Sequence, residues 1–346
     1  MDVIDPVSVT RLVVWMLVLG PVVLGVPSPL AARHLRPAHD RLPGGGEHPD
    51  PGRRSPPVAV VAAAAALLAT SVGLSACSGP ATTEHLSRTA DYLPGRAADV
   101  YLPDDVSAAP VVVLVPGGAW RTADRRGLAP LAEALAAAGV VAVSTTHLAV
   151  DDGGRFPGPV QDVTCSVGFA VAAARQSGID PTHVVVLGHS SGGHLAGLAA
   201  LAPDRFRASC PYPPARPDGF IGLAGTYDVD RYPHLALSLF GADARQRPDL
   251  WHDGNVLTWA HETSMRARVS VLLLHGAQDA DVRLSGTDDL AEALHASGFR
   301  VLTEVIPDAT HATIYTADVA GPRVLDWLEH LDDEAGVASP NSGTRS

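Results

Sequence analysis

A serine lies between two glycines in the segment Gly188-His189-Ser190-Ser191-Gly192, which matches the pattern G-x-S-x-G. A run of valines and a leucine precedes this segment, and an alanine- and leucine-rich stretch follows it. The pattern predicts a strand, a sharp turn at Ser190 and a helix. Such a turn strains the backbone at the serine and leaves no room for side chains two residues away, which favours glycine there. The segment therefore indicates a nucleophilic hydroxyl raised above a sheet.

A serine hydroxyl is a poor nucleophile without a base, and the partners are expected later in the chain in the order acid, then histidine. The predicted strand Val271–Leu274 leads into a loop with Asp279, and Asp281 is an alternative acid in the same loop. The predicted strand Val301–Ile306 leads into a short loop with His311. His311 is selected from the fifteen histidines by this position alone.

A tetrahedral intermediate also needs hydrogen-bond donors for its negative oxygen. The predicted strand Val111–Val115 opens into Pro116-Gly117-Gly118-Ala119-Trp120, where glycines let backbone N–H groups approach a substrate closely. We expect these donors to be the amides of Gly117 or Gly118 and of Ser191. The alternative is an ordinary turn after a strand, which proline and glycine also form.

Strands and helices alternate along the rest of the chain. The strands are solid Val, Ile and Leu, as expected where both faces of a sheet are covered. This alternation predicts an α/β fold with one doubly wound, mostly parallel sheet. The further predicted strands are Val140–Ser144, Val184–Leu187 and Phe220–Leu223, and the predicted helices are Leu128–Ala138, Pro159–Gln176, Ser191–Ala202, Thr287–Ala296 and Val319–Leu331.

Taken together, these motifs resemble the serine esterases of the α/β-hydrolase fold. More narrowly, they resemble a bacterial esterase and kynurenine-formamidase-like branch related to hormone-sensitive lipase. The resemblance runs from about Tyr92 to Leu331, through VYLP, PGGAW, GHSSGGHLAG, GLAGTYDV, HGAQDADV and THATIY. The family pattern H-G-x-x-D-x-x-V favours Asp279 as the acid.

The chain departs from this family at two places. Pro116 stands where the oxyanion loop of relatives usually begins with a histidine that braces the loop. The run Thr145-Thr146-His147-Leu148 replaces an N-Y-R-L-like run of relatives.

The motifs predict hydrolysis of a carboxylic ester through an acyl-serine, with a small or medium acyl group because no large lid insertion is evident. The same triad would serve a formamidase or amidase, or a carbohydrate deacetylase. A catalytically silent binding module is the alternative from another class. No Cys/His cluster has metal-ligand spacing, so neither a metal nor an organic cofactor is expected.

The segment from Gly225 to Val269 carries Tyr227, Tyr232, Leu239, Phe240, Trp251 and Trp259. These side chains would either shape an acyl or alcohol pocket above the strand ends or pack the segment onto the domain.

The N-terminal part of the chain predicts export. Residues 1–76 form a targeting region in which 58–76 resembles the apolar core of a secretory signal. The apolar stretch 12–26 is either a further membrane segment or the result of a start site assigned too early. The run ends in Leu-Ser-Ala-Cys77, which resembles the lipobox of bacterial lipoproteins, with Cys77 as the lipidated residue. A plain transmembrane anchor is the alternative. Either arrangement predicts an extracytoplasmic, membrane-anchored protein with a polar tether at 77–90, a catalytic domain at 91–333 and a disordered tail at 334–346.

Cysteine usage and charge agree with this organisation. Cys165 and Cys210 would form a disulfide in an oxidising compartment or, alternatively, serve as two small buried hydrophobic residues. The net charge is −12, and no basic stripe with interleaved aromatic residues is found, which argues against nucleic acid as a partner.

Overall fold

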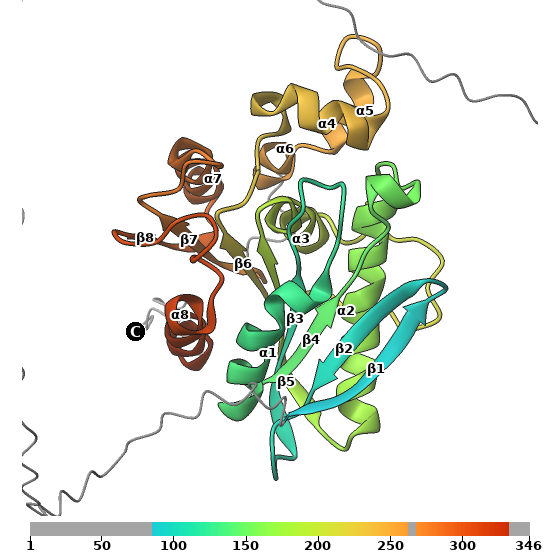
Figure 1. Ribbon diagram of the computed structural model, residues 1–346, viewed down its shortest axis with the longest axis vertical. Helices are drawn as coiled ribbons and strands as arrows, with labels where there is room; N and C mark the ends of the chain where they lie inside the picture. Colours follow the sequence, from blue (N-terminus) through green and yellow to red (C-terminus); the bar gives the residue numbers. More distant parts are fainter. Residues whose placement is uncertain (1–84, 262–267, 332–346) are drawn as a thin grey trace, which may run out of the picture. The chain divides into compact units, whose positions relative to one another are not determined.

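The computed structural model describes residues 85–261 and 268–331. Its centre is an eight-stranded sheet in the order β1-β2-β4-β3-β5-β6-β7-β8 (Figure 1). β1 pairs antiparallel with β2 and β2 with β4, and every other pairing is parallel. The strands are β1 Leu86–Leu93, β2 Arg96–Tyr101, β3 Ala108–Val115, β4 Val141–Thr145, β5 Asp180–His189, β6 Gly219–Leu223, β7 Ser270–Gly276 and β8 Arg300–Ile306.

Helices cover both faces of this sheet and enclose two hydrophobic cores. One core receives side chains from α2, α3 and α7, and the other receives side chains from α1 and α8. The helices are α1 Ala129–Ala137, α2 Gly158–Gln176, α3 Ser191–Leu201, α4 Pro233–Phe240, α5 Pro248–Asp253, α6 Val256–Ala260, α7 Leu284–Ala296 and α8 Ala317–Glu329. The predicted α/β fold with a doubly wound, mostly parallel sheet is confirmed.

The central strands are apolar throughout because both of their faces are covered. All residues of β4, β6 and β7 are buried. In β3 alternate residues contact opposite cores: Val111 and Val113 lie in one and Val112 and Leu114 in the other. An unbroken run of β-branched residues in the sequence therefore reflects two cores, one on each side of the sheet.

The first two strands were not predicted from the sequence. β1 begins at Leu86, so the ordered domain starts within the stretch expected to be a tether up to Ala90, and that boundary was wrong. β1 is an edge strand whose residues alternate between partly buried and exposed along most of its length, and polar residues at the exposed positions hide the strand pattern.

The predicted membrane segments at 12–26 and 58–76, the lipidation site Cys77 and the tail at 334–346 lie outside the described residues. Within the part that is described, no helix is both long and apolar enough to cross a bilayer.

Candidate active site

Ser190 lies between the end of β5 and the start of α3, with φ 55° and ψ −123°. Such a conformation costs about 1–3 kcal/mol and persists only where neighbours fix it. The Ser190 amide donates to the Leu223 carbonyl at 3.0 Å, and the Ser190 carbonyl accepts from the amides of Gly193 at 2.9 Å and Thr226 at 3.2 Å. These bonds hold the strained turn against the next strand, β6, and the loop that follows it.

The two glycines of the motif are required by close backbone contacts. A Cβ on Gly188 would lie 2.2 Å from the Gly192 carbonyl oxygen, and a Cβ on Gly192 would lie 2.2 Å from the Val115 carbonyl oxygen. A side chain at 188 would push β5 away from the start of α3, and one at 192 would push the turn away from the end of β3. The sequence interpretation of G-x-S-x-G thus has a direct steric basis in this structure.

Asp279, and not Asp281, contacts His311. The carboxylate Oδ2 of Asp279 lies 2.8 Å from His311 Nδ1, and its Oδ1 accepts from the backbone amides of Asp281 at 2.9 Å and Val282 at 2.8 Å. The Asp279 side chain is 1% exposed, whereas Asp281 is exposed to solvent. Because a carboxylate accepts, His311 Nδ1 carries the proton and Nε2 is left with a free lone pair. This pairing is the geometry of an acid that orients a general base.

The loops that carry Asp279 and His311 are bonded to each other. The amide of Ala277 donates to the Ile306 carbonyl at 2.9 Å, and the amide of Gln278 donates to the Ala309 carbonyl at 3.0 Å. His275, fully buried at the end of β7, donates from Nε2 to the Val282 carbonyl at 3.0 Å and accepts from Thr287 Oγ1 at Nδ1. Burial lowers the pKa of His275 and keeps it neutral. Sequence reasoning missed this brace, although the His-Gly pair at the strand end was visible.

The loop after β3 lies against the Ser190 turn. A Cβ on Gly117 would lie 2.9 Å from Ser190 Cβ. Among the described residues, the backbone amides of Gly117, Gly118 and Ser191 make no hydrogen bond. Unpaired donors in the serine turn and in the loop that packs against it are what an oxyanion hole requires.

A tryptophan and a histidine brace this loop. Trp120, fully buried, donates from its indole Nε1 to Nδ1 of His194 at 3.1 Å, and His194 Nε2 donates to the Gly254 carbonyl at 2.6 Å. Burial lowers the pKa of His194 to about 4, so the ring is neutral and offers one donor and one acceptor. The loop that begins at Pro116 is therefore bonded to α3 through Trp120.

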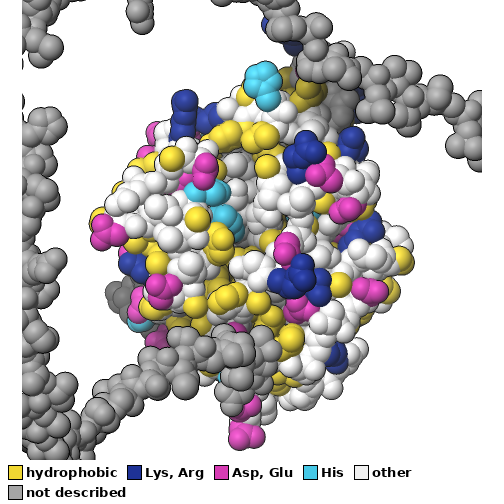
Figure 2. Space-filling model, viewed as in Figure 1, with side chains coloured by type: hydrophobic (Ala, Val, Ile, Leu, Met, Phe, Trp, Pro, Cys, Tyr) yellow, Lys and Arg dark blue, Asp and Glu magenta, His cyan; other side chains and the backbone are white. Residues whose placement is uncertain are grey.

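Ser190 and His311, although both are described, are not hydrogen-bonded to each other. Hydrogen bonds of this kind are often long in structures without substrate and shorten when substrate binds. Figure 2 shows histidine side chains beside a hollow on this face of the domain, with hydrophobic side chains around it.

Comparison with known proteins agrees with the fold. The BD-FAE family model matches residues 98–294, which include Ser190 and Asp279. The chain belongs to the BD-FAE family.

Three proteins of Mycobacterium tuberculosis are similar to this BD-FAE protein. LipM is 34% identical over 131 residues, which are 37% of this chain and 30% of LipM. Esterase LipC is 28% identical and matches 59% of this chain and 53% of its own length. Esterase LipQ is 26% identical and matches 75% of this chain and 61% of its own length. This chain thus spans about a third to three fifths of these relatives.

Solved structures share the fold of this BD-FAE protein. A truncated carbohydrate esterase from gut microbiota matches with a TM-score of 0.64 at 20% identity, over 74% of this chain and 99% of the other. An esterase of Thermogutta terrifontis matches with a TM-score of 0.60 at 18% identity, over 75% of this chain and 98% of the other. In the Thermogutta terrifontis esterase, this fold therefore accounts for almost the entire chain.

The aromatic residues between Gly225 and Val269 mainly pack the segment onto the domain. Tyr227, Leu239, Phe240 and Trp251 are buried and belong to the core on the α2 and α3 face. Trp251 Nε1 donates to the Ala242 carbonyl. This favours the packing alternative for Tyr227, Leu239 and Phe240, whereas Trp251 both packs in the core and lines a pocket with Pro233, His234 and Leu237.

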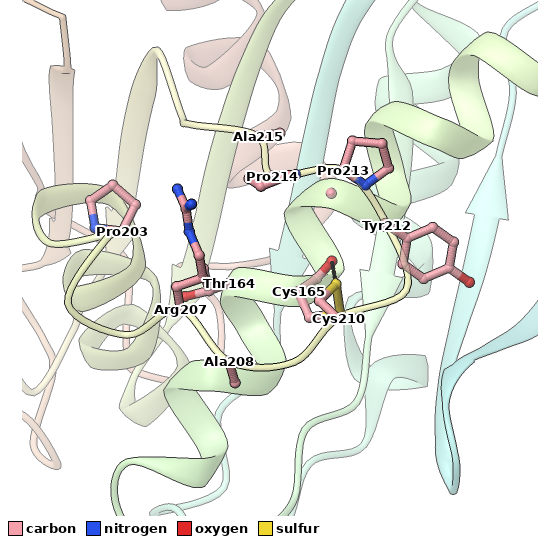
Figure 3. A pocket seen from close by; sticks show the side chains of 11 residues that line it. Thr164, Cys165, Pro203, Arg207, Ala208, Cys210, Tyr212, Pro213, Pro214 and Ala215 are labelled. Atoms are coloured by element: carbon pink, nitrogen blue, oxygen red, sulfur yellow. Dashed lines mark hydrogen bonds between the residues drawn. A yellow bond between two sulfur atoms is a disulfide. The ribbon is translucent and has the colours of Figure 1, made fainter.

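Cys165 and Cys210 form a disulfide, with their Cα atoms 5.6 Å apart. The bond joins α2 to the loop at 203–215, which lies so close to the helix that a Cβ on Gly168 would be 2.7 Å from the Pro213 carbonyl oxygen. Figure 3 shows the disulfide beside a small pocket of about 120 Å³ between helix and loop. Neither Ser190, Asp279 nor His311 lines this pocket.

One group of side chains has the composition of a metal site. Ligand atoms of Asp279, Asp281 and His311 lie within 4.8 Å of one another. Two of these residues already bond to each other as the acid and base of the site, and Asp281 is exposed. The cluster is explained by the Asp279–His311 pair.

Proposed function

We propose that this BD-FAE protein hydrolyses carboxylic esters through an acyl-enzyme formed on Ser190. The observation that carries the proposal is the Asp279–His311 pair, set at the same end of the sheet as a strained serine turn. The three unpaired amides near that serine support the same reaction, and so do the esterase names of its relatives LipC and LipQ.

In the first half of the reaction, Ser190 Oγ attacks the ester carbonyl carbon and His311 Nε2 takes the hydroxyl proton. Asp279 accepts the hydrogen bond from His311 Nδ1 and stabilises the imidazolium. The amides of Gly117 or Gly118 and of Ser191 donate to the oxygen that becomes negative. The tetrahedral intermediate collapses, the C–O bond to the alcohol breaks, and His311 returns the proton to the departing alcohol oxygen.

In the second half, His311 takes a proton from water, whose oxygen attacks the acyl-serine carbonyl. The second tetrahedral intermediate breaks the bond to Ser190 Oγ, which regains its proton from His311. The products are the free acid and the alcohol, and no redox step is required.

Formamide or amide hydrolysis and carbohydrate deacetylation would use the same residues and remain alternatives within hydrolases. A silent binding module would not need an intact acid–base pair or free oxyanion amides, and both are found in this chain.

The test is turnover of p-nitrophenyl esters from acetate to decanoate, together with p-nitroacetanilide and an acetylated sugar. Wild type is compared with Ser190→Ala, and a fluorophosphonate probe reports whether Ser190 is nucleophilic. Ester turnover that is lost in Ser190→Ala supports the proposal, and the chain-length optimum gives the acyl size. No turnover and no labelling of Ser190 would overturn it in favour of a binding module.

We also propose that the protein is exported and held at the membrane by a lipid on Cys77. The sequence pattern that ends at Cys77 supports this. Radiolabelled palmitate should be incorporated into the wild type and not into Cys77→Ala. An unlabelled protein that still sediments with membranes would point to a transmembrane anchor instead.

A further inference from the structure

His189 is a buried side chain next to Ser190 that the reaction described above does not use. It ends β5 and is 8% exposed. Its Nε2 lies 3.0 Å from the backbone carbonyl oxygen of His311. Because a carbonyl can only accept, Nε2 carries the proton and donates to it. A side chain adjacent to the nucleophile thus holds the backbone of the base.

The imidazole of His189 also contacts the two neighbouring loops. Its ring centroid lies 4.6 Å from that of His311 and 4.3 Å from that of Tyr315. On its other edge, Nδ1 lies 3.0 Å from the place that a Cβ on Gly117 would occupy. The ring of His189 therefore contacts both the loop that carries His311 and the loop that carries Gly117. His189 is also the residue that directly precedes the nucleophile Ser190.

His189 is uncharged in this position. The titratable groups that face it are His311, Asp279 and Tyr315. Burial first, and then the positive charge that His311 can carry, lower the pKa of His189 to about 3. The neutral ring does not repel the imidazolium that forms on His311 when it takes the Ser190 proton.

The side chains of Ser190 and His311 do not bond to each other directly. The distance between Ser190 Oγ and the His311 ring therefore depends on where the backbone places these two residues. Within residues 85–261 and 268–331, no side chain other than that of His189 hydrogen-bonds to the backbone of His311. A general base that is displaced by about 1 Å can cost about 100-fold in rate. The His189 bond is thus suited to fix this distance.

We propose that His189 is a positioning residue for His311, and that its Nε2–H holds the His311 backbone where the imidazole can reach Ser190 Oγ. The proposal rests on the ester hydrolysis proposed above. It assigns to the residue before the nucleophile a role in aligning the base.

The test compares three substitutions at His189 in the full chain. His189→Gln keeps an amide donor at the reach of Nε2, His189→Asn has a donor that is too short, and His189→Phe keeps a ring without a donor. We expect kcat within about 5-fold of wild type for Gln and a loss of about 10- to 100-fold for Asn and Phe, with KM changed by less than about 3-fold. His147→Gln, a change at another buried histidine outside the site, is the control and should leave kcat unchanged.

Each outcome bears on a separate claim. If the wild type does not turn over esters, the proposed function fails. If the wild type is active and Gln, Asn and Phe all keep wild-type kcat, the positioning role is overturned while the esterase stands. If Phe does not fold, the comparison of Gln with Asn still decides, because these two side chains differ only in reach. Equal losses of kcat in Gln and Asn would also overturn the role, since donor reach would then not matter.

Discussion

The indole of Trp120 and the imidazole of His194 form a fully buried hydrogen bond of 3.1 Å between the loop after β3 and helix α3. His194 in turn donates to the carbonyl of Gly254, between α5 and α6. The oxyanion loop is thus tied to the helix that begins at the nucleophile and to the segment above it. These two bonds hold the loop that begins at Pro116, where this chain lacks the histidine expected from the family resemblance.

Trp120→Phe should lower both stability and kcat. The substitution leaves His194 Nδ1 buried without a donor, which costs about 1–3 kcal/mol of unfolding free energy in addition to the lost volume. Loosening of the loop should reduce kcat by about 10-fold or more, since oxyanion donors act only when they are aligned. Urea denaturation and p-nitrophenyl ester kinetics measure the two effects.

The matched control is Trp259→Phe. Its indole Nε1 bonds to the Asp253 carbonyl, outside the oxyanion loop. We expect a loss of stability with kcat retained. A kcat for Trp120→Phe as high as that of the control would show that the Trp120–His194 bond does not align the loop.

Asp279→Asn and Asp281→Asn separate the two candidate acids. An amide at 279 can no longer fix the proton on His311 Nδ1 or stabilise the imidazolium, so kcat should fall by about 10³- to 10⁴-fold. Asp281 is exposed and contributes its backbone amide, which the substitution keeps, so kcat should change by less than about 3-fold. Steady-state kinetics with circular dichroism as a folding control distinguishes them. A large loss in Asp281→Asn alone would reverse the assignment.

The sequence was sufficient for the elements whose signals are local. The runs Val111–Val115 and Val271–Leu274 are apolar because they lie between two cores, and this predicts buried parallel strands directly. The glycine at 188 marks the Ser190 turn through a local contact with the Gly192 backbone, and the spacing of the G-x-S-x-G motif identifies Gly192, although its own close contacts are to Val115 and Pro116.

Contacts between distant segments could not be predicted in the same way. The bond from Trp120 to His194 joins residues 74 apart in sequence, and that from His189 to His311 joins residues 122 apart. Nothing in the local sequence around Trp120 or His189 indicates which distant residue its side chain will bond to. The edge strand β1 was missed for another reason, since three of its eight residues, Ser87, Thr89 and Asp91, are exposed and polar.

Gly192→Ala should destabilise the domain and abolish activity. The new methyl would lie 2.2 Å from the Val115 carbonyl oxygen, so the turn at Ser190 must move away from β3. Gly286→Ala in α7 is the control, because a Cβ there meets nothing within 4 Å. Gly286 is buried but has open space beside it, and alanine in place of glycine in a helix is expected to stabilise by up to about 1 kcal/mol. Thermal unfolding measures the stability of the two variants, and ester turnover measures their activity. An active, stable Gly192→Ala would contradict the steric account.

The Cys165–Cys210 bond should stabilise the domain without serving catalysis. It closes a loop with a sequence separation of 45 residues, for which the chain-entropy model gives about 4 kcal/mol. The double variant Cys165→Ala/Cys210→Ala should therefore unfold at lower urea concentration and keep the kcat of the wild type while folded. Addition of a reductant should lower the stability of the wild type and leave that of the variant unchanged. Equal stability of the two proteins in the absence of reductant would show that the bond does not form in solution.

Stability should fall as the pH drops from about 6.5 to 4, because buried histidines, His147 and His194 among them, resist protonation. Burial lowers the pKa of His147 and of His194 to about 4 in the folded state, against about 6.5 in the unfolded chain. Between these values the unfolded chain binds the protons more tightly, so each histidine removes about 1.4 kcal/mol of unfolding free energy per pH unit as the pH falls. The two histidines therefore do not reduce the unfolding free energy above pH 6.5, and they reduce it to their full extent once the pH has fallen to about 4.

His147→Leu isolates one of these contributions. Both ring nitrogens of His147 are buried without a well-formed hydrogen bond among the described residues, and the polar group beside the ring is the Leu148 backbone, so leucine removes little hydrogen bonding. The difference in unfolding free energy between pH 7 and pH 5, from urea titrations, should shrink by about 2 kcal/mol relative to wild type. An unchanged difference would mean that His147 is already protonated, or solvated, in the folded protein at pH 5.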